Sequence, residues 1–251
     1  MPFENRTAIV TGASRGIGRA IALKAAAAGY HVCVNYARNE AAARDVVAAI
    51  EAAGGHALAV KADMTIEADI LRLFNTVDKE LPPLAVLVNN AGIVDAAARV
   101  ADMSLERLER MFTTNITGPF LCAREAVKRL STKQGGSGGG IVNISSVAAK
   151  LGSPNEYVDY AASKAAIDTF TKGLAMEVAM EGIRVNAVRP GIIRTDIHAS
   201  GGQPGRVDRV KGAVPMQRGG EAEEVADAVL WLMSPQSSYV TGALIDVSGG
   251  R

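Results

Sequence analysis

Two residue types that can move a proton lie close together in the stretch YVDYAASKAA, residues 157–166. Tyr160 and Lys164 are four positions apart, and residues with this spacing on a helix are neighbours on one face. Tyr157 lies two turns from the lysine, so Tyr160 is the expected partner. An ammonium group near a phenol favours the phenolate and lowers its pKa from about 10. Because a general acid or base works best with a pKa near the working pH, the pair predicts proton transfer at a carbonyl or hydroxyl group.

A second hydroxyl is expected to bind the substrate oxygen. Ser145 and Ser146 end the apolar run GIVNISS. Successive residues of a strand point to opposite faces, so only one of the two serines can point into the site.

A glycine-rich turn near the start of the chain can hold a diphosphate. Gly12, Gly16 and Gly18 of TGASRGIGRA follow an apolar run and open an Ala-rich stretch. Glycines allow a close approach of the backbone to a ligand, and the N-terminus of the following helix supplies N–H groups and positive potential. The spacing G-x-x-x-G-x-G is neither G-x-G-x-x-G nor a Walker A loop. Its position between the first strand and the first helix is therefore what indicates dinucleotide binding.

Seven short runs rich in β-branched residues alternate with Ala-rich stretches. The expected strands cover 7–12, 31–36, 56–63, 84–90, 140–146, 183–190 and 242–249, and the expected helices cover about 15–28, 40–53, 66–80, 104–130, 157–181 and 221–233. Apolar strands that alternate with helices indicate a buried parallel sheet with helices on both faces. The prediction is an α/β, Rossmann-type doubly wound fold with a seven-stranded parallel sheet, as a single domain over residues 1–251.

Two segments interrupt this alternation. Residues 131–140, STKQGGSGGG, are expected to form a loop tip rather than a linker, because a strand follows at once. Residues 196–220 are long, polar and Gly-rich, with at most a short helix expected. Long loops in compact domains are usually functional or mobile. We expect residues 196–220 to form a lid over the site, with disorder as the alternative.

Composition argues against several classes of function. The net charge of +1 gives no electrostatic footprint for nucleic acid or an anionic membrane, and no apolar run approaches the ~18 residues of a membrane span. MPFENRTAIVTG shows no signal peptide. Cys33 and Cys122 are expected to be free buried thiols, and the three histidines lack ligand spacing, so no metal site is predicted. We expect a soluble cytoplasmic protein.

Four motifs together resemble the short-chain dehydrogenase/reductase superfamily. They are TGASRGIG at 11–18, NNAG at 89–92, YAASK at 160–164 and RPG at 189–191, with the order and spacing of that family over nearly the whole chain. The resemblance implies a nicotinamide cofactor and hydride transfer at a ketone or secondary alcohol. It also implies that Tyr160 is the general acid/base and that Lys164 additionally binds the nicotinamide ribose.

The resemblance extends to further site residues. It favours Ser146 as the substrate-binding hydroxyl, but the stretch from Ser146 to Tyr160 is one residue longer than is usual in the family, which keeps Ser145 as an alternative. The implied cofactor-binding residues are Gly12, Ser14, Arg15, Gly16, Ile17, Gly18, Asp63, Met64, Asn90, Ala91, Gly92, Tyr160, Lys164, Pro190, Gly191, Ile193 and Thr195.

The second strand carries the signal for cofactor choice. NAD sites of this type place an acid about 20 residues beyond the glycines. Here the strand ends VNYARNE, the first acid is Glu40, and two cations, Arg15 and Arg38, can reach a 2′-phosphate. Arginine suits phosphate geometry, and a charged hydrogen bond contributes roughly 1.5–3 kcal/mol. The two arginines favour NADP(H); solvated surface arginines are the alternative.

The resemblance adds Asn115, in TTNITGPF, to the catalytic residues. Pro119 lies four residues further on and has no N–H, so the carbonyl of Asn115 loses its helical partner and needs another donor. A water held there can link Lys164 to solvent as a proton relay. A proline kink with a surface Asn is the alternative.

These residues predict an NADP(H)-dependent oxidoreductase acting on a small carbonyl or alcohol substrate. A 3-oxoacyl thioester and a sugar or polyol compete as substrates, and Arg206, Arg209 and Lys211 would either attract a phosphorylated carrier or be solvated. A non-catalytic dinucleotide-binding regulator is the alternative from another class. The resemblance also implies a homotetramer, with interfaces on helices 104–130 and 157–181 and on the C-terminal YVTGALIDVSGGR.

Overall fold

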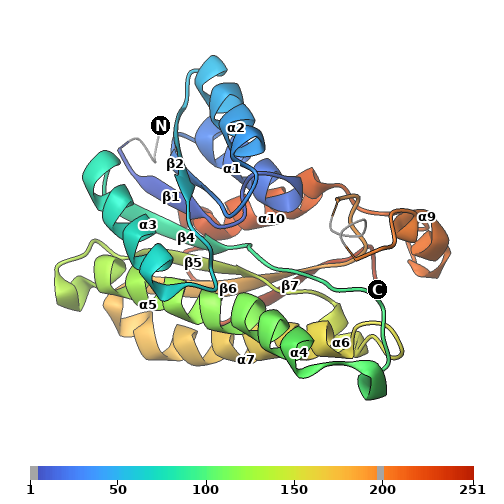
Figure 1. The fold of residues 1–251 in the computed structure, drawn as a ribbon. Coiled ribbons are helices and arrows are strands. Elements are labelled where there is room, and N and C mark those ends of the chain that lie inside the picture. The colour runs from blue at the N-terminus through green and yellow to red at the C-terminus, as the bar shows by residue number, and fades with distance from the viewer. Residues whose placement is uncertain (1–4, 197–200) are drawn as a thin grey trace.

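All seven predicted strands lie in one parallel sheet in the computed structural model, which describes residues 5–196 and 201–251. The strand order is β3-β2-β1-β4-β5-β6-β7 (Figure 1). The strands are β1 (Thr7–Val10), β2 (His31–Tyr36), β3 (His56–Lys61), β4 (Leu84–Asn89), β5 (Gly139–Ile144), β6 (Ile183–Pro190) and β7 (Leu244–Val247). The predicted Rossmann-type fold is confirmed. Its order reverses between β1 and β4, and ligands of such sheets bind at the carboxyl ends of the strands at that point.

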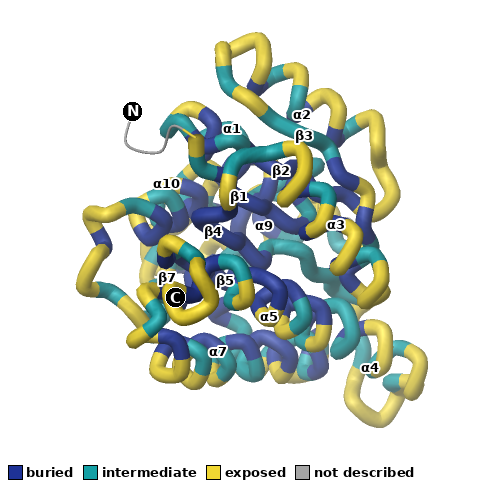
Figure 2. Tube along the Cα trace, turned by 90° about the vertical axis from the view of Figure 1, so that its left-hand side faces the viewer, coloured by how far each residue is buried: buried dark blue, intermediate teal, exposed yellow. Residues whose placement is uncertain are grey.

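Helices cover both faces of the sheet, as Figure 1 shows. One face carries α1 (Gly16–Ala27), α2 (Glu40–Ala52) and α10 (Ala222–Met233), and the other carries α3 (Glu67–Glu80), α5 (Gly118–Leu130) and α7 (Val158–Val178). Alternating strand side chains supply two separate cores: Val10 packs with the first group and Ile9 with the second. Figure 2 shows the buried strands as a dark central layer. This two-sided burial explains why the strand sequences are almost continuously apolar.

The helix expected over 104–130 is interrupted. It consists of α4 (Leu105–Phe112), a π-helical turn over Thr113–Thr117, and α5. In the π turn the N–H of Gly118 donates to the carbonyl of Thr113. Such turns contain an extra residue and are frequent at functional sites. Gly118 and Pro119 follow this turn, so the interruption falls where the sequence predicts a lost helical hydrogen bond.

Two short helices complete the described chain. α6 (Ala148–Leu151) follows β5 and was not predicted, and α9 (Arg206–Val210) is the short helix expected within residues 196–220. Single 3₁₀ turns lie at Val100–Asp102, Thr132–Gln134, Ala179–Glu181, Lys211–Ala213 and Pro235–Ser237. Residues 197–200 of the expected lid lie outside the described residues. Within the described ranges, no helix has the length and apolar character to cross a membrane.

Candidate active site

The glycine turn between β1 and α1 lies at the carboxyl edge of the sheet, at the point where the strand order reverses. Gly12 and Gly16 have φ angles of 62° and 53°, in the left-handed region that favours glycine. A Cβ on Gly18 would lie 2.4 Å from the carbonyl oxygen of Gly12. Arg15 occupies the N-cap position of α1, and its side chain has no oxygen to cap the helix. The first N–H groups of α1 therefore stay available for an anionic group.

Side chains from the neighbouring strands shape this turn. Nδ2 of Asn90, after β4, donates to the carbonyls of Thr11 and Gly12 at 2.8 and 3.1 Å. Oγ1 of Thr11 accepts from the N–H groups of Asn90 and Ala91, both at 2.9 Å. Oδ1 of the buried Asn35, in β2, accepts from the N–H of Gly12 at 3.0 Å. Asn35 was not predicted as a site residue. The available signal was an amide side chain near the end of the second strand, where the prediction looked only for an acidic residue.

Two arginines lie at this edge of the sheet. Arg15, at the start of α1, and Arg38, after β2, are both exposed. Glu40, the first acid after β2, lies on α2 and pairs with Arg44 at 2.6 Å. Nδ2 of Asn35 donates to the carbonyl of Ala62 at 3.0 Å, which fixes this amide between β2 and β3.

The remaining predicted cofactor residues come from other loops at the same edge. Thr195, after β6, lies against the glycine turn, since a Cβ on Gly16 would be 3.3 Å from Cγ2 of Thr195. Gly191 packs closely on the residue after β7, where a Cβ would lie 2.7 Å from a backbone atom. Oδ1 of Asp63 accepts from the N–H and hydroxyl of Thr65 at 2.9 and 2.7 Å. Buried or half-buried members of the set are Ser14, Ile17, Met64, Pro190 and Ile193.

Tyr160 and Lys164 lie near the start of α7. Nζ of Lys164 is 5.6 Å from the centre of the Tyr160 ring, and it donates to the carbonyl of Ile144 at 2.8 Å. A Cβ on Gly92 would lie 3.5 Å from this Nζ and 3.3 Å from Oδ1 of Asn115. The glycine of the NNAG motif thus leaves space for both side chains.

The two candidate serines have different partners. Oγ of Ser145 donates to the carbonyl of Lys164 at 3.1 Å, so this hydroxyl ties the end of β5 to α7. Oγ of Ser146 accepts from the N–H of Ala148 at 3.1 Å, and its hydroxyl is hydrogen-bonded to Tyr160. The structure therefore pairs Ser146, rather than Ser145, with Tyr160.

Asn115 is fully buried in the π turn. Its Oδ1 accepts from the N–H of Ile93 at 2.8 Å, and its Nδ2 donates to the carbonyl of Ile93 at 3.0 Å and to Oγ of Ser163 at 3.1 Å. Ser163 in turn donates to the carbonyl of Tyr160 at 2.7 Å. The alternative of a surface Asn is therefore wrong, and Asn115 connects the chain after β4 to the helix that carries Tyr160 and Lys164. The relay water stays a prediction.

Burial determines the protonation of the central pair. Burial raises the pKa of the Tyr160 phenol, and the hydrogen bond with Ser146 offsets this only in part. Burial therefore outweighs the effect expected of Lys164, and the expectation of a lowered pKa for Tyr160 is wrong for this structure. Burial also lowers the pKa of Lys164 to about 8, against the opposing charge of Asp168. Both shifts have one cause, because removal from water disfavours the charged form of each group. The phenol is protonated at neutral pH.

A buried ion pair that sequence reasoning missed fixes the first turn of α7. Nε and Nη2 of Arg107, on α4, donate to the carboxylate of Asp159 at 2.7 and 3.2 Å, and Nη1 donates to the carbonyl of Ala96 at 2.6 Å. The two side chains are 11% and 0% exposed. Asp159 directly precedes Tyr160, so this pair positions the tyrosine. The sequence offers no signal that joins residues so far apart.

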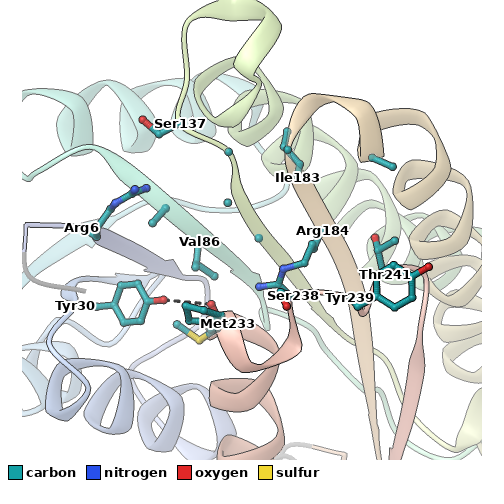
Figure 3. A pocket seen from close by; sticks show the side chains of 17 residues that line it. Arg6, Tyr30, Val86, Ser137, Ile183, Arg184, Met233, Ser238, Tyr239 and Thr241 are labelled. Carbon is teal, nitrogen blue, oxygen red and sulfur yellow. Dashed lines mark hydrogen bonds between the residues drawn. The ribbon is translucent and has the colours of Figure 1, made fainter. Parts of the chain in front are cut away.

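Two of the cavities formed by the described residues lie outside the glycine turn. One of about 700 Å³ lies beside the amino ends of β1, β4, β5 and β6, with Arg6 and Arg184 entering from opposite sides (Figure 3). It contains none of the predicted site residues, and Nη1 of Arg184 donates to the carbonyl of Leu232, in α10, at 2.9 Å. The other, of about 560 Å³, lies at the carboxyl edge between Ile193 and residues 246–251. Only the second adjoins the candidate active site.

The structure combines a doubly wound parallel sheet with a glycine turn at its carboxyl edge. The side chains of Ser146, Tyr160, Lys164 and Asn115 cluster at the same edge. This combination is typical of dinucleotide-binding oxidoreductases. A family model described as "Enoyl-(Acyl carrier protein) reductase" matches residues 12–251. The chain belongs to the short-chain dehydrogenase/reductase superfamily, an oxidoreductase family that uses nicotinamide cofactors.

Three known proteins show the extent of the similarity. "Uncharacterized oxidoreductase YgfF" of Escherichia coli is 59% identical over 244 residues, which cover 97% of this chain and 99% of the relative. A "3-oxoacyl-[acyl-carrier-protein] reductase" of Synechocystis is 42% identical over 246 residues, covering 98% and 96%. The crystal structure of a dehydrogenase/reductase from Sinorhizobium meliloti superposes with a TM-score of 0.91 at 35% identity, covering 99% and 95%.

Proposed function

We propose that this protein is an NADP(H)-dependent oxidoreductase that transfers a hydride between the nicotinamide and a ketone or secondary alcohol. One observation carries the proposal. The Lys164 ammonium lies 5.6 Å from the Tyr160 ring, and the Ser146 side chain acts to lower the pKa of Tyr160, at the sheet edge that also holds the glycine turn. This is the arrangement needed to bind a carbonyl oxygen and give it a proton beside a dinucleotide.

The residues at this edge fit a nicotinamide dinucleotide. The left-handed turn at Gly12 and Gly16 and the open N-terminus of α1 suit a diphosphate. Arg15 and Arg38 would bind the 2′-phosphate of NADP, since Glu40 is paired with Arg44. When bound, the cofactor supplies or accepts the hydride at its nicotinamide ring.

The side chains manage the proton. In reduction, the Tyr160 hydroxyl donates its proton to the carbonyl oxygen as negative charge develops there, and the Ser146 hydroxyl donates a hydrogen bond to the same oxygen. In oxidation the step runs in reverse: Tyr160 must first lose its proton, and the resulting phenolate then takes the proton of the alcohol. The Lys164 ammonium stabilises the phenolate left after reduction. We place the relay water at the carbonyl of Asn115, from which Pro119 removes a helical donor.

The charges of residues 206–211 bear on the substrate. Arg206 and Arg209 pair with Glu156 at 2.6 and 3.6 Å, and Lys211 pairs with Asp208 at 3.1 Å. Paired cations attract a phosphorylated carrier less than free ones, which supports a small uncharged ketone, sugar or polyol as the first candidate. A 3-oxoacyl thioester is the second candidate, since the Synechocystis relative bears that activity in its name.

The assembly and location are also proposals. Met176 and Met180, on and after α7, are 79% and 86% exposed, and the half-exposed Phe120 of α5 stacks on Phe170 with ring centres 3.8 Å apart. Apolar side chains on these two helices support a homotetramer. Free buried Cys33 and Cys122 suit the reducing cytoplasm.

The test is an assay of the purified protein in both directions. Reduction is measured with NADPH or NADH and a panel of small ketones and acetoacetyl thioester. Oxidation is measured with NADP or NAD and glucose or polyols. We expect turnover with NADPH or NADP to exceed turnover with NADH or NAD by about tenfold or more, as one charged hydrogen bond to a phosphate implies. Tight NADPH binding without turnover across the whole panel would instead establish the non-catalytic regulator.

A further inference from the structure

Three segments distant in the sequence meet at the start of α7. The N–H of Ala98, after β4, donates to the carbonyl of Glu156 at 3.0 Å. Nη2 of Arg206, on α9, donates to the Glu156 carboxylate at 2.6 Å. Glu156 lies four residues before Tyr160. The chain leading into the catalytic helix is therefore held through its backbone by one segment and through its side chain by another.

Arg206 makes the larger share of these contacts. Its side chain is 12% exposed, and its guanidinium carbon lies 4.8 Å from the ring centre of the buried Tyr157, the N-cap residue of α7. Nη1 donates to the side-chain oxygen of Gln203 at 3.1 Å. The hydrogen bond from Arg206 is the main cause that lowers the pKa of Glu156. A charged pair that is partly removed from water and stacked on an aromatic ring is stronger than an exposed pair.

The backbone held by these contacts is strained. Ser153 and Asn155 have φ angles of 45° and 62°, which residues other than glycine rarely adopt. Strain of this kind persists only where the surroundings hold it, and it is typical of functional sites. This turn also lies within the stretch between Ser146 and Tyr160 that is one residue longer than is usual in the family.

We propose that Arg206 is a positioning residue for Tyr160. By binding Glu156 and Tyr157 it couples α9 to the first turn of α7, and it holds the strained turn in the conformation that places the phenol beside Ser146. The inference rests on the proposed function for the role of Tyr160. Because most of the expected cofactor-binding residues lie on other elements, loss of Arg206 affects proton transfer far more than cofactor binding.

The test compares Arg206→Gln with Lys211→Gln, an exposed cation of the same segment that pairs with Asp208. Hydrogen exchange of residues 153–164 is measured first. We expect the amides at the start of α7 to exchange about tenfold faster in Arg206→Gln, and at the wild-type rate in Lys211→Gln. With the best ketone, kcat should fall by about tenfold while the Kd for NADPH stays within about twofold.

A charge exchange tests the ion pair itself. The double variant Glu156→Arg, Arg206→Glu should regain at least half of the protection from hydrogen exchange that Arg206→Gln loses. Arg206→Lys keeps the charge, and its exchange rates should lie between those of the wild type and Arg206→Gln. It replaces Arg206→Gln in the test if that variant does not fold. Equal exchange rates in Arg206→Gln and Lys211→Gln, or no recovery in the double variant, would overturn the proposal. If the wild-type protein turns over no carbonyl at all, the proposed function fails, while the exchange rates still decide whether Arg206 holds α7.

Discussion

Nζ of Lys164 lies 5.6 Å from the centre of the Tyr160 ring while it donates a hydrogen bond to the carbonyl of Ile144, at the end of β5. Oγ of Ser145 returns the contact by donating to the carbonyl of Lys164 at 3.1 Å. Lys164, the partner of Tyr160, is therefore held by the strand end as well as by its own helix. Rigid placement of this kind is what proton transfer to a bound oxygen requires.

Removing the Tyr160 hydroxyl should abolish most of the activity. In Tyr160→Phe we expect kcat to fall by about 10²–10⁴-fold, the range typical of general acid–base catalysis, with a much smaller loss of NADPH affinity, because the glycine turn is unchanged. Steady-state kinetics and fluorescence titration measure the two quantities. Tyr239→Phe, at a fully exposed ring, is the control and should match the wild type. Retained turnover in Tyr160→Phe would remove the tyrosine from the mechanism.

Cofactor preference should depend on Arg15 and Arg38. Replacing either with Gln should reduce kcat/KM for NADPH by about tenfold and leave that for NADH unchanged, because only NADPH has the 2′-phosphate. Arg44→Gln, which removes the partner of Glu40 on α2, should not have this selective effect. Parallel losses with both cofactors would show that these arginines support the structure rather than bind the phosphate.

The buried ammonium of Lys164 should make stability depend on pH. Its pKa is lowered to about 8 by burial, so between that value and its ordinary pKa the unfolded chain binds more protons than the folded protein, and stability rises with pH. Relative to Lys164→Met, the wild-type protein should gain about 2 kcal/mol in free energy of unfolding from about pH 7 to about pH 9.5.

Urea unfolding of both proteins at the two pH values measures this gain. Lys172→Met removes an exposed lysine of the same helix and should differ from the wild type by the same amount at both pH values. A pH-independent difference between the wild type and Lys164→Met would contradict the lowered pKa.

Breaking the Arg107–Asp159 pair should be costly. Arg107→Met leaves the carboxylate of Asp159 buried without its cation, and such changes destabilise proteins by about 3–5 kcal/mol. Arg110→Met removes a half-exposed arginine of the same helix that pairs with Asp95, and should cost no more than about 1 kcal/mol. Urea unfolding at neutral pH compares the two. Similar losses of unfolding free energy in Arg107→Met and Arg110→Met would mean that burial does not make the Arg107–Asp159 pair more important for stability than the exposed pair.

Sequence reasoning predicted well what depends on local pattern. Buried parallel strands can be recognised in the sequence because side chains on both of their faces are apolar. Val10 and Ile9, for example, are neighbours in β1 and pack into different cores. The spacing of Tyr160 and Lys164 placed them on one helix face. Pro119 also indicated a break in the helix near Asn115.

Long-range contacts and the depth of burial could not be predicted in this way. Arg107 and Asp159 are joined only by the fold, and Asn115 is buried because it bonds Ile93 and Ser163. The spacing of Tyr160 and Lys164 suggests that the ammonium attracts a phenolate, but it contains no information on how far burial removes the two groups from water. That loss reverses the expected direction for the pKa of Tyr160.

All strands of the sheet run in the same direction, so each group at the carboxyl edge lies in the connection that follows a different strand. The glycine turn follows β1, the NNAG motif follows β4, Ser146 follows β5, and residues 191–196 follow β6. Grafting a different peptide between α9 and α10 would therefore exchange one wall of the adjoining cavity, while Thr195, Arg206 and the groups after β1, β4 and β5 stay in place. Such a scaffold is suited to acquiring new substrates one loop at a time.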